Sequence, residues 1–64
     1  MLGEYLKKYR LEKNLTQKQM ALKLKINHCY YCSIERDKLK PGIQTINSIA
    51  KLLKIEPMFV RGLL

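Results

Sequence analysis

The chain has 64 residues, a net charge of +8 and two cysteines, and these values exclude several protein classes. A chain of this length allows one domain with a thin core. Its 13 Lys and Arg against 5 Asp and Glu favour a nucleic acid as the partner, ahead of an anionic membrane. No apolar run approaches the ~20 residues that span a bilayer, and the charged, amphipathic first segment is not typical of a signal peptide. Two cysteines this close in sequence cannot form the disulfide framework of a secreted protein, so we expect a reduced, cytoplasmic setting.

Two helices are predicted in the first part of the chain. Apolar residues at helical spacing mark one face of the first helix, namely Leu2, Leu6 and Tyr9. This pattern ends near residues 13–14. Thr16 followed by Gln19 matches a capping box, which predicts the start of a second helix. The second helix ends at about residue 24 or 25, and its buried stripe consists of Met20, Ala21 and Leu24.

Three further helices are predicted after residue 26. Asn27 is a good N-cap for a third helix, whose inward face carries Tyr31 and Ile34. Pro41-Gly42 marks a loop. The apolar residues of a fourth helix then repeat at helical spacing: Ile43, Ile46, Ile49, Ala50 and Leu53. Pro57 suits the first turn of a short fifth helix. Strand-like alternation is missing, so we predict an all-α fold, a compact five-helix bundle in a single domain over residues 1–64.

The predicted second and third helices are short and are joined by about three residues, 25–27. This spacing is typical of a helix-turn-helix. In such a unit the second helix braces against the backbone of a duplex, and the third presents its outward residues to the major groove. We therefore expect double-stranded DNA as the partner.

Several short segments support this interpretation by occurring together at one spacing. They are Leu15-Thr16-Gln17, Met20-Ala21, Leu24, Ile26-Asn27, Ile34-Glu35-Arg36 and Lys40-Pro41. Together they resemble the Cro/C1-type (XRE) helix-turn-helix family of phage and bacterial repressors, over nearly the whole chain. The resemblance implies a lambda repressor-like DNA-binding domain with its helix-turn-helix at about residues 16–36. It also implies a transcriptional regulator, most simply a repressor, that binds a pseudo-palindromic operator as a homodimer through the major groove.

The resemblance implies a role for each matching residue. The residues expected to read bases, on the outward side of the third helix, are His28, Cys29, Cys32 and Ser33. The residues expected at the DNA backbone are Thr16, Gln17, Lys18, Tyr30, Arg36, Lys38 and Lys40. Gln17 is also expected to support the third helix. Arg10 and Glu35 match a charged pair between the first and third helices, which we interpret as architectural.

The C-terminal residues are unusually apolar, and one side of a helix cannot bury them all. We expect part of this set to form the contact between two copies of the chain: Met58, Phe59, Val60, Leu63 and Leu64. The chain also departs from the family where glycine is usual, at Lys25, Asp37 and Lys54. Either these turns are reshaped or a small strain is accepted. Tyr31 replaces a smaller residue, so either its ring pushes the third helix outward or its hydroxyl reaches the rim of the core.

Cys29 and Cys32 form a C-x-x-C pair beside the single histidine, His28. Structural zinc needs four ligands, and a second pair is missing, so we predict no metal and no cofactor. A disulfide between residues i and i+3 of a helix is sterically allowed, which keeps open a redox switch on the DNA-reading face. The main interpretation is that both cysteines are small side chains facing DNA or solvent.

Other functional classes fit the sequence less well. His28 has no accompanying nucleophile pattern or paired carboxylates, so we expect neither an enzyme nor a small-molecule substrate. Short, capped helices disfavour a membrane-surface peptide. The main rival is an antitoxin or anti-repressor-like protein-interaction module, supported by the aromatic Cys-Tyr-Tyr-Cys stretch. We expect a chain encoded by a bacterium or a phage that acts on DNA in the cytoplasm.

Overall fold

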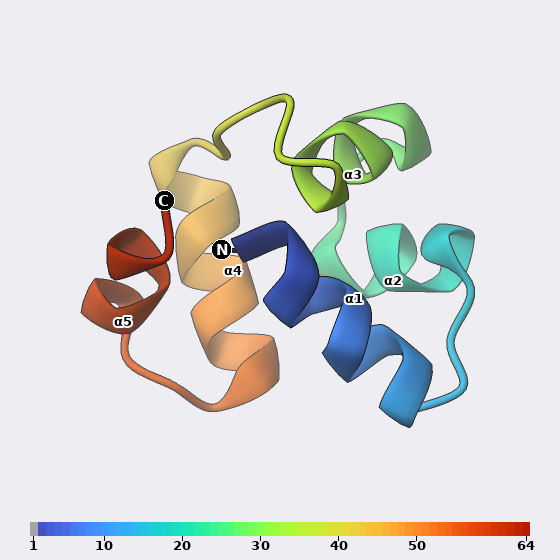
Figure 1. The fold of residues 1–64 in the computed structure, drawn as a ribbon, viewed down its shortest axis with the longest axis horizontal. Coiled ribbons are helices and arrows are strands. Elements are labelled where there is room, and N and C mark those ends of the chain that lie inside the picture. The colour runs from blue at the N-terminus through green and yellow to red at the C-terminus, as the bar shows by residue number, and fades with distance from the viewer. Residues whose placement is uncertain (1) are drawn as a thin grey trace.

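The helices of the protein are seen in a computed structural model that describes residues 2–64 (Figure 1). They are α1 (Leu2–Glu12), α2 (Gln17–Leu24), α3 (His28–Glu35), α4 (Ile43–Leu53) and α5 (Pro57–Gly62). No β-strand occurs in the described residues, so the predicted all-α fold of five helices is confirmed. In Figure 1, α5 packs on α4 at one side of the molecule, α2 and α3 lie at the other, and α1 runs between them.

Local capping sets the starts of α2 and α3. The Thr16 hydroxyl accepts a hydrogen bond from the Gln19 amide at 3.0 Å, and the Gln19 side chain accepts one from the Thr16 amide at 2.8 Å. This is the predicted capping box, which satisfies two amides that the helix itself leaves free. At the start of α3, the Asn27 side chain accepts from the Cys29 amide at 2.7 Å. Both helices of the pair therefore begin where local chemistry places them.

Left-handed residues follow four of the helices. Lys25 (φ 59°), Asp37 (φ 58°) and Lys54 (φ 57°) all adopt this conformation, as does Asn14 (φ 57°) after α1. The first three are the positions where the resembled family has glycine. The turns thus keep the left-handed conformation, and the backbone strain costs roughly 1–2 kcal/mol at a residue other than Gly, Asn or Asp, which here means Lys25 and Lys54. At Asp37 the carboxylate compensates, because it accepts a hydrogen bond from the Gly3 amide at 3.0 Å.

The core forms where the inward faces of the helices meet. Its buried apolar residues are Leu2, Leu6, Met20, Ala21, Leu24, Tyr31, Ile34, Ile46, Ile49, Ala50 and Val60. The predicted buried faces of α2 and α3 are therefore confirmed. Gly3 allows the start of α1 to approach the end of α3, since a Cβ there would collide with the Glu35 carbonyl oxygen.

Tyr31 lies wholly inside this core, with no exposed surface. Its hydroxyl has no hydrogen-bond partner in residues 2–64. Of the two alternatives for Tyr31, the one in which the hydroxyl reaches the rim is therefore wrong. The reason is geometric, because Tyr31 and Ile34 lie on the face of α3 that packs against the rest of the protein. Burial raises the pKa of Tyr31 far above its ordinary value, so the hydroxyl keeps its proton.

Helix α5 divides its apolar residues between the core and the surface. Val60 is fully buried, so its expected part in a contact between two copies is wrong: its side chain fills the core of its own chain. Leu63 is half-buried and packs against the same core. Met58, Phe59 and Leu64 remain exposed, at 82%, 49% and 41%. No helix in residues 2–64 has the length and apolar character needed to cross a membrane.

Candidate DNA-binding interface

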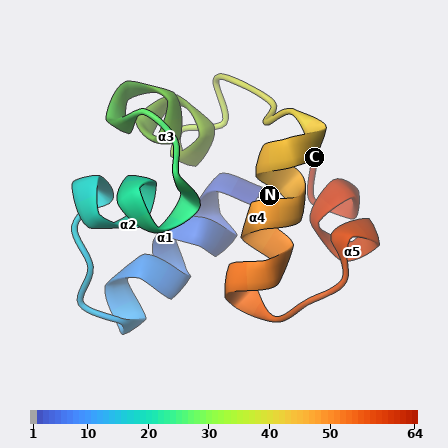
Figure 2. The same cartoon turned by 180° about the vertical axis from the view of Figure 1, so that it is seen from behind.

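Helix α3 has one buried face and one free face. Tyr31 and Ile34 point into the core. At 100° per residue, Cys29 and Arg36 lie on the opposite side of the helix, and both are exposed. Figure 2, which views the molecule from behind, shows α3 at one end of the fold, beyond α2, with the segment that leads to α4 beside it. The free face of α3 is therefore open to a large ligand.

The four expected base-reading residues are not equally available. His28 and Cys29, in the first turn of α3, are exposed, whereas Cys32 and Ser33 are half-buried. The Cys32 thiol donates a hydrogen bond to the Gln17 side-chain oxygen at 3.3 Å. It also lies 3.4 Å from Nε2 of His28. Cys32 thus contacts its neighbours in the fold, while His28 and Cys29 border on solvent.

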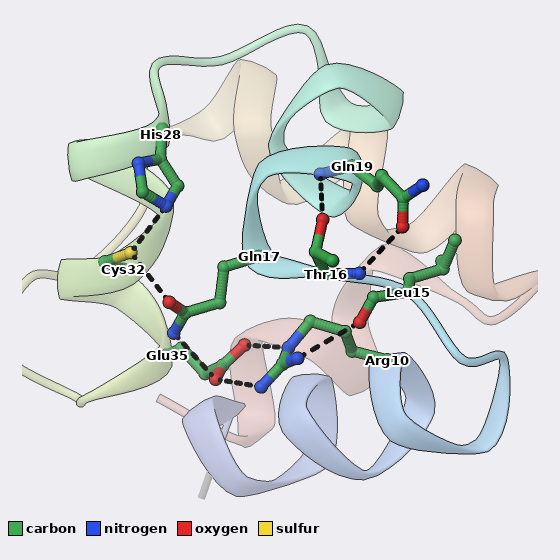
Figure 3. A network of polar contacts seen from close by, with 8 residues as sticks. All are labelled: Arg10, Leu15, Thr16, Gln17, Gln19, His28, Cys32 and Glu35. Carbon is green, nitrogen blue, oxygen red and sulfur yellow. Dashed lines mark hydrogen bonds and ion pairs between the residues drawn. The ribbon is translucent and has the colours of Figure 1, made fainter.

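A chain of polar contacts links α3 to α2 and α1 (Figure 3). Gln17 of α2 donates from Nε2 to Glu35 Oε1 at 3.2 Å. Arg10 of α1 donates to both Glu35 oxygens, from Nε at 2.9 Å and from Nη2 at 3.0 Å, and Nη1 donates to the Leu15 carbonyl at 3.1 Å. Such a two-pronged contact fixes orientation as well as distance. The structure therefore brings Arg10, Gln17, Cys32 and Glu35 together behind the free face of α3.

The ion pair of this cluster is shielded from water. The Arg10 and Glu35 side chains are only 12% and 5% exposed. Burial alone would raise the pKa of Glu35, but the hydrogen bonds and charge of Arg10, together with the other polar side chains beside the carboxylate, outweigh burial and lower that pKa. The hydrogen bond from Glu35 likewise raises the pKa of Arg10. The pair stays charged, and its hydrogen bonds fix the C-terminal end of α3 to α1 and α2.

The residues expected at the DNA backbone lie in three places. Thr16, Gln17 and Lys18 stand at the start of α2, where the Thr16 hydroxyl is engaged in the cap. Arg36, Lys38 and Lys40 are exposed and follow α3 directly. The third helix also carries Tyr30, whose hydroxyl accepts from the Gly42 amide at 3.1 Å and so fixes the entry to α4.

The charge around α3 is positive for a structural reason. Glu35, the last residue of α3, is balanced by Arg10, so Asp37, which accepts a hydrogen bond from the Gly3 amide, is the one carboxylate in residues 36–40 that offsets Arg36, Lys38 and Lys40. The cations after α3 take part in no ion pair formed by residues 2–64. Unbalanced positive charge of this kind attracts a polyanion and raises the rate of encounter with it.

Sequence reasoning missed the contacts that Cys32, Tyr30 and Asp37 make. The His28–Cys32 contact follows from i, i+4 spacing and could have been found that way. The contacts of Cys32 with Gln17 and of Asp37 with Gly3 join different helices, so no local pattern signals them. The aromatic surface suggested by Cys-Tyr-Tyr-Cys does not form, because Tyr31 is buried and Tyr30 is half-buried.

The cysteines and the histidine do not form a metal site. Nowhere in residues 2–64 do three or more His, Cys, Asp or Glu side chains come close enough together to hold a metal ion. Both cysteines are free thiols. Their possible oxidation to a disulfide stays a prediction.

Comparisons with known proteins bear on this arrangement. Residues 3–58 match a family described as a helix-turn-helix domain. The chain is 34% identical over 61 residues to the immunity repressor protein of Bacillus phage phi105, which covers 95% of this chain and 42% of that protein. It is 38% identical over 53 residues to the uncharacterized HTH-type transcriptional regulator YqaF of Bacillus subtilis strain 168, which covers 83% of this chain and 70% of that protein. The chain thus spans less than half the length of the phage repressor. No solved structure matches it.

Proposed function

The chain belongs to the helix-turn-helix domain family, and from this premise we propose that it is a sequence-specific DNA-binding transcriptional regulator that acts as a repressor. The observation that carries the proposal is the free face of α3, which projects from a helix-turn-helix unit anchored by the Arg10–Glu35 pair. The relatives named as a phage immunity repressor and a bacterial transcriptional regulator support it. We place its action in the cytoplasm of a bacterium, with a bacterial or phage gene as its source.

In the proposed complex, α3 lies in the major groove of double-stranded DNA. His28 and Ser33 have side chains that exchange hydrogen bonds well with base edges, while Cys29 adds mainly apolar contact. Arg36, Lys38 and Lys40 neutralise phosphates, as does the start of α2. Because phosphate contacts release counterions, affinity for any DNA falls steeply as salt rises.

The proposed active form is a symmetric dimer on a pseudo-palindromic operator. The exposed apolar residues Met58, Phe59 and Leu64 support a contact through α5. Tyr5 extends this surface onto α1, because its ring meets the Phe59 ring edge to face with centroids 5.8 Å apart. A second copy of the same surface would cover it. Two copies of α3 would then enter successive major grooves about 34 Å apart.

Selection of bound sequences from a random DNA pool tests the DNA-binding proposal. We expect a pseudo-palindromic consensus for the wild type, with a half-site spacing that reports the dimer. Lys40→Ala should weaken binding to all sequences alike, whereas His28→Ala should change which sequence is preferred. Both side chains are exposed, so both variants should fold. A protein of this charge that fails to shift DNA even at low salt would overturn the proposal.

Sedimentation of two variants tests the dimer separately. Met58→Asp places a charge on the expected contact, so we expect it to sediment as a monomer. Leu22→Asp is the matched control, since Leu22 is 75% exposed on α2 and lies outside the proposed contact. Equal association of the two variants would contradict a contact through α5.

A further inference from the structure

In the polar cluster behind α3, the donor and the acceptor of each hydrogen bond can be assigned in turn, starting from Arg10. A guanidinium group can only donate hydrogen bonds, and an ionised carboxylate can only accept them. Arg10 therefore holds Glu35 as an acceptor on both oxygens. Gln17 must then turn its amide nitrogen toward Glu35, which leaves its amide oxygen facing Cys32. The orientation of the Gln17 amide thus follows from donor and acceptor chemistry alone.

The same reasoning continues through the thiol to the imidazole. The Gln17 oxygen has no hydrogen, so the single hydrogen of the Cys32 thiol is used in the 3.3 Å contact with it. Toward His28 the sulfur can then only accept, across 3.4 Å. In a neutral imidazole one ring nitrogen carries a hydrogen and the other carries a lone pair. Nε2 must be the donor, so Nδ1 holds the lone pair.

The position of His28 gives this lone pair a role. His28 is exposed at the start of α3, and Figure 3 shows its second ring nitrogen turned away from Cys32 and Gln17. Within the proposed function, on which this step rests, we propose that Cys32 is a positioning residue that presents the Nδ1 lone pair of His28 to the major groove. His28 then selects a base with an exocyclic amino group, which is cytosine through N4 or adenine through N6. Guanine and thymine offer only acceptors along this edge, so a lone pair meets no donor on them.

Base analogues in the selected operator test the direction of this hydrogen bond. The base read by His28 is the one whose preference disappears in His28→Ala. An analogue of that base without the amino group should weaken wild-type binding about threefold to tenfold, the range expected for one neutral hydrogen bond. A 7-deaza analogue, which removes the N7 acceptor of a purine, should have no effect.

Cysteine variants test the role of Cys32. The readout is the binding penalty for deleting the amino group, which a loss of protein stability would not change. In Cys32→Ala, the penalty for deleting the amino group should shrink, because the Nδ1 lone pair is no longer held toward the groove and the ring presents either nitrogen. Cys32→Ser should restore much of the penalty, since a hydroxyl also donates one hydrogen and accepts another. Cys29→Ala is the matched control on the same helix. It changes the overall affinity, because Cys29 contacts DNA in the proposed complex, but the penalty measured relative to the same variant should stay the same, since Cys29 makes no side-chain hydrogen bond to His28 in the described part of the chain. Thermal melts establish that each variant is folded.

The outcomes separate this inference from the proposed function. If the wild type selects no sequence, the proposed function fails. If it selects a sequence and loss of N7 weakens binding of the wild type but not of His28→Ala, His28 donates, and the inference alone is wrong. A penalty that Cys32→Ala leaves unchanged would equally show that Cys32 does not position His28. A smaller penalty in Cys32→Ala and its return in Cys32→Ser support the inference.

Discussion

Replacement of Tyr31 by phenylalanine should stabilise the protein. Tyr31 is completely buried, and its hydroxyl makes no hydrogen bond within residues 2–64. Burial raises its pKa far above the ordinary value, so the group stays protonated, and no acceptor meets hydrogen-bond geometry with it in residues 2–64. The hydroxyl lies close to Arg10 and Glu35, and their charges act on its pKa in opposite directions, Glu35 raising it and Arg10 lowering it.

The expected size of the effect comes from two opposing contributions. A buried polar group without a partner costs about 1–3 kcal/mol, which Tyr31→Phe would recover. The missing oxygen leaves a small void, and a void of methyl size costs about 1 kcal/mol. The net change is a gain of ~1 kcal/mol in the free energy of unfolding. For a domain of this size that corresponds to a rise in Tm of about 4–8 °C.

Urea and thermal unfolding, followed by circular dichroism, measure this change. The neighbouring residue supplies the control, because Tyr30→Phe removes the same atom from a hydroxyl that does accept a bond, from the Gly42 amide. That variant should lose up to about 1 kcal/mol, since water replaces part of an exposed bond. The two substitutions thus have opposite expected signs. A destabilised Tyr31→Phe would refute the reasoning, and would mean that the hydroxyl is bonded to Glu35 or to a buried water.

Three other substitutions have defined outcomes. Glu35→Gln should cost ~3 kcal/mol because it leaves Arg10 charged without its partner. The pKa of Glu35 is lowered from its ordinary 4.5, so the wild type should be more stable than Glu35→Gln above pH 4.5 and should lose this extra stability as the pH falls further. A difference in the free energy of unfolding that stays constant from about pH 7 to 3 would contradict this role of the Glu35 charge. Gly3→Ala should destabilise by several kcal/mol in urea, because the added Cβ collides with the Glu35 carbonyl oxygen and α1 must move. Lys54→Gly should raise Tm slightly by relieving the left-handed strain, and a lowered Tm would show that the Lys54 side chain contributes more than the strain costs.

The helices could be predicted because their signals are local. The capping box at Thr16, the N-cap at Asn27 and the apolar stripes each depend on residues within one or two turns of the same helix. The left-handed turns at Lys25 and Lys54 were foreseen as one of two options, because the surrounding pattern requires a sharp helix end even where glycine is missing.

The remaining features depend on contacts between helices. The burial of the Tyr31 hydroxyl depends on how closely α1 approaches α3, and that distance is set by Gly3. Likewise, helical periodicity predicts that Cys32 faces outward. Its thiol instead contacts Gln17, because α2 places the Gln17 side chain beside it. Periodicity gives the direction in which a side chain leaves its helix, while its partners come from the packing of the whole chain.

Cys29 and Cys32 differ in their contacts, and this difference affects how the DNA sequence preferred by the protein could change. Cys29 makes no side-chain hydrogen bond in the described residues, and it borders on solvent. A new side chain at this position would therefore alter the surface offered to a ligand and leave stability almost untouched. Cys32 and Gln17 instead share contacts across two helices, so their effects should not add independently. A substitution at Cys29 can thus alter specificity without disturbing the contacts between helices, whereas a substitution at Cys32 also removes or changes the contact with Gln17.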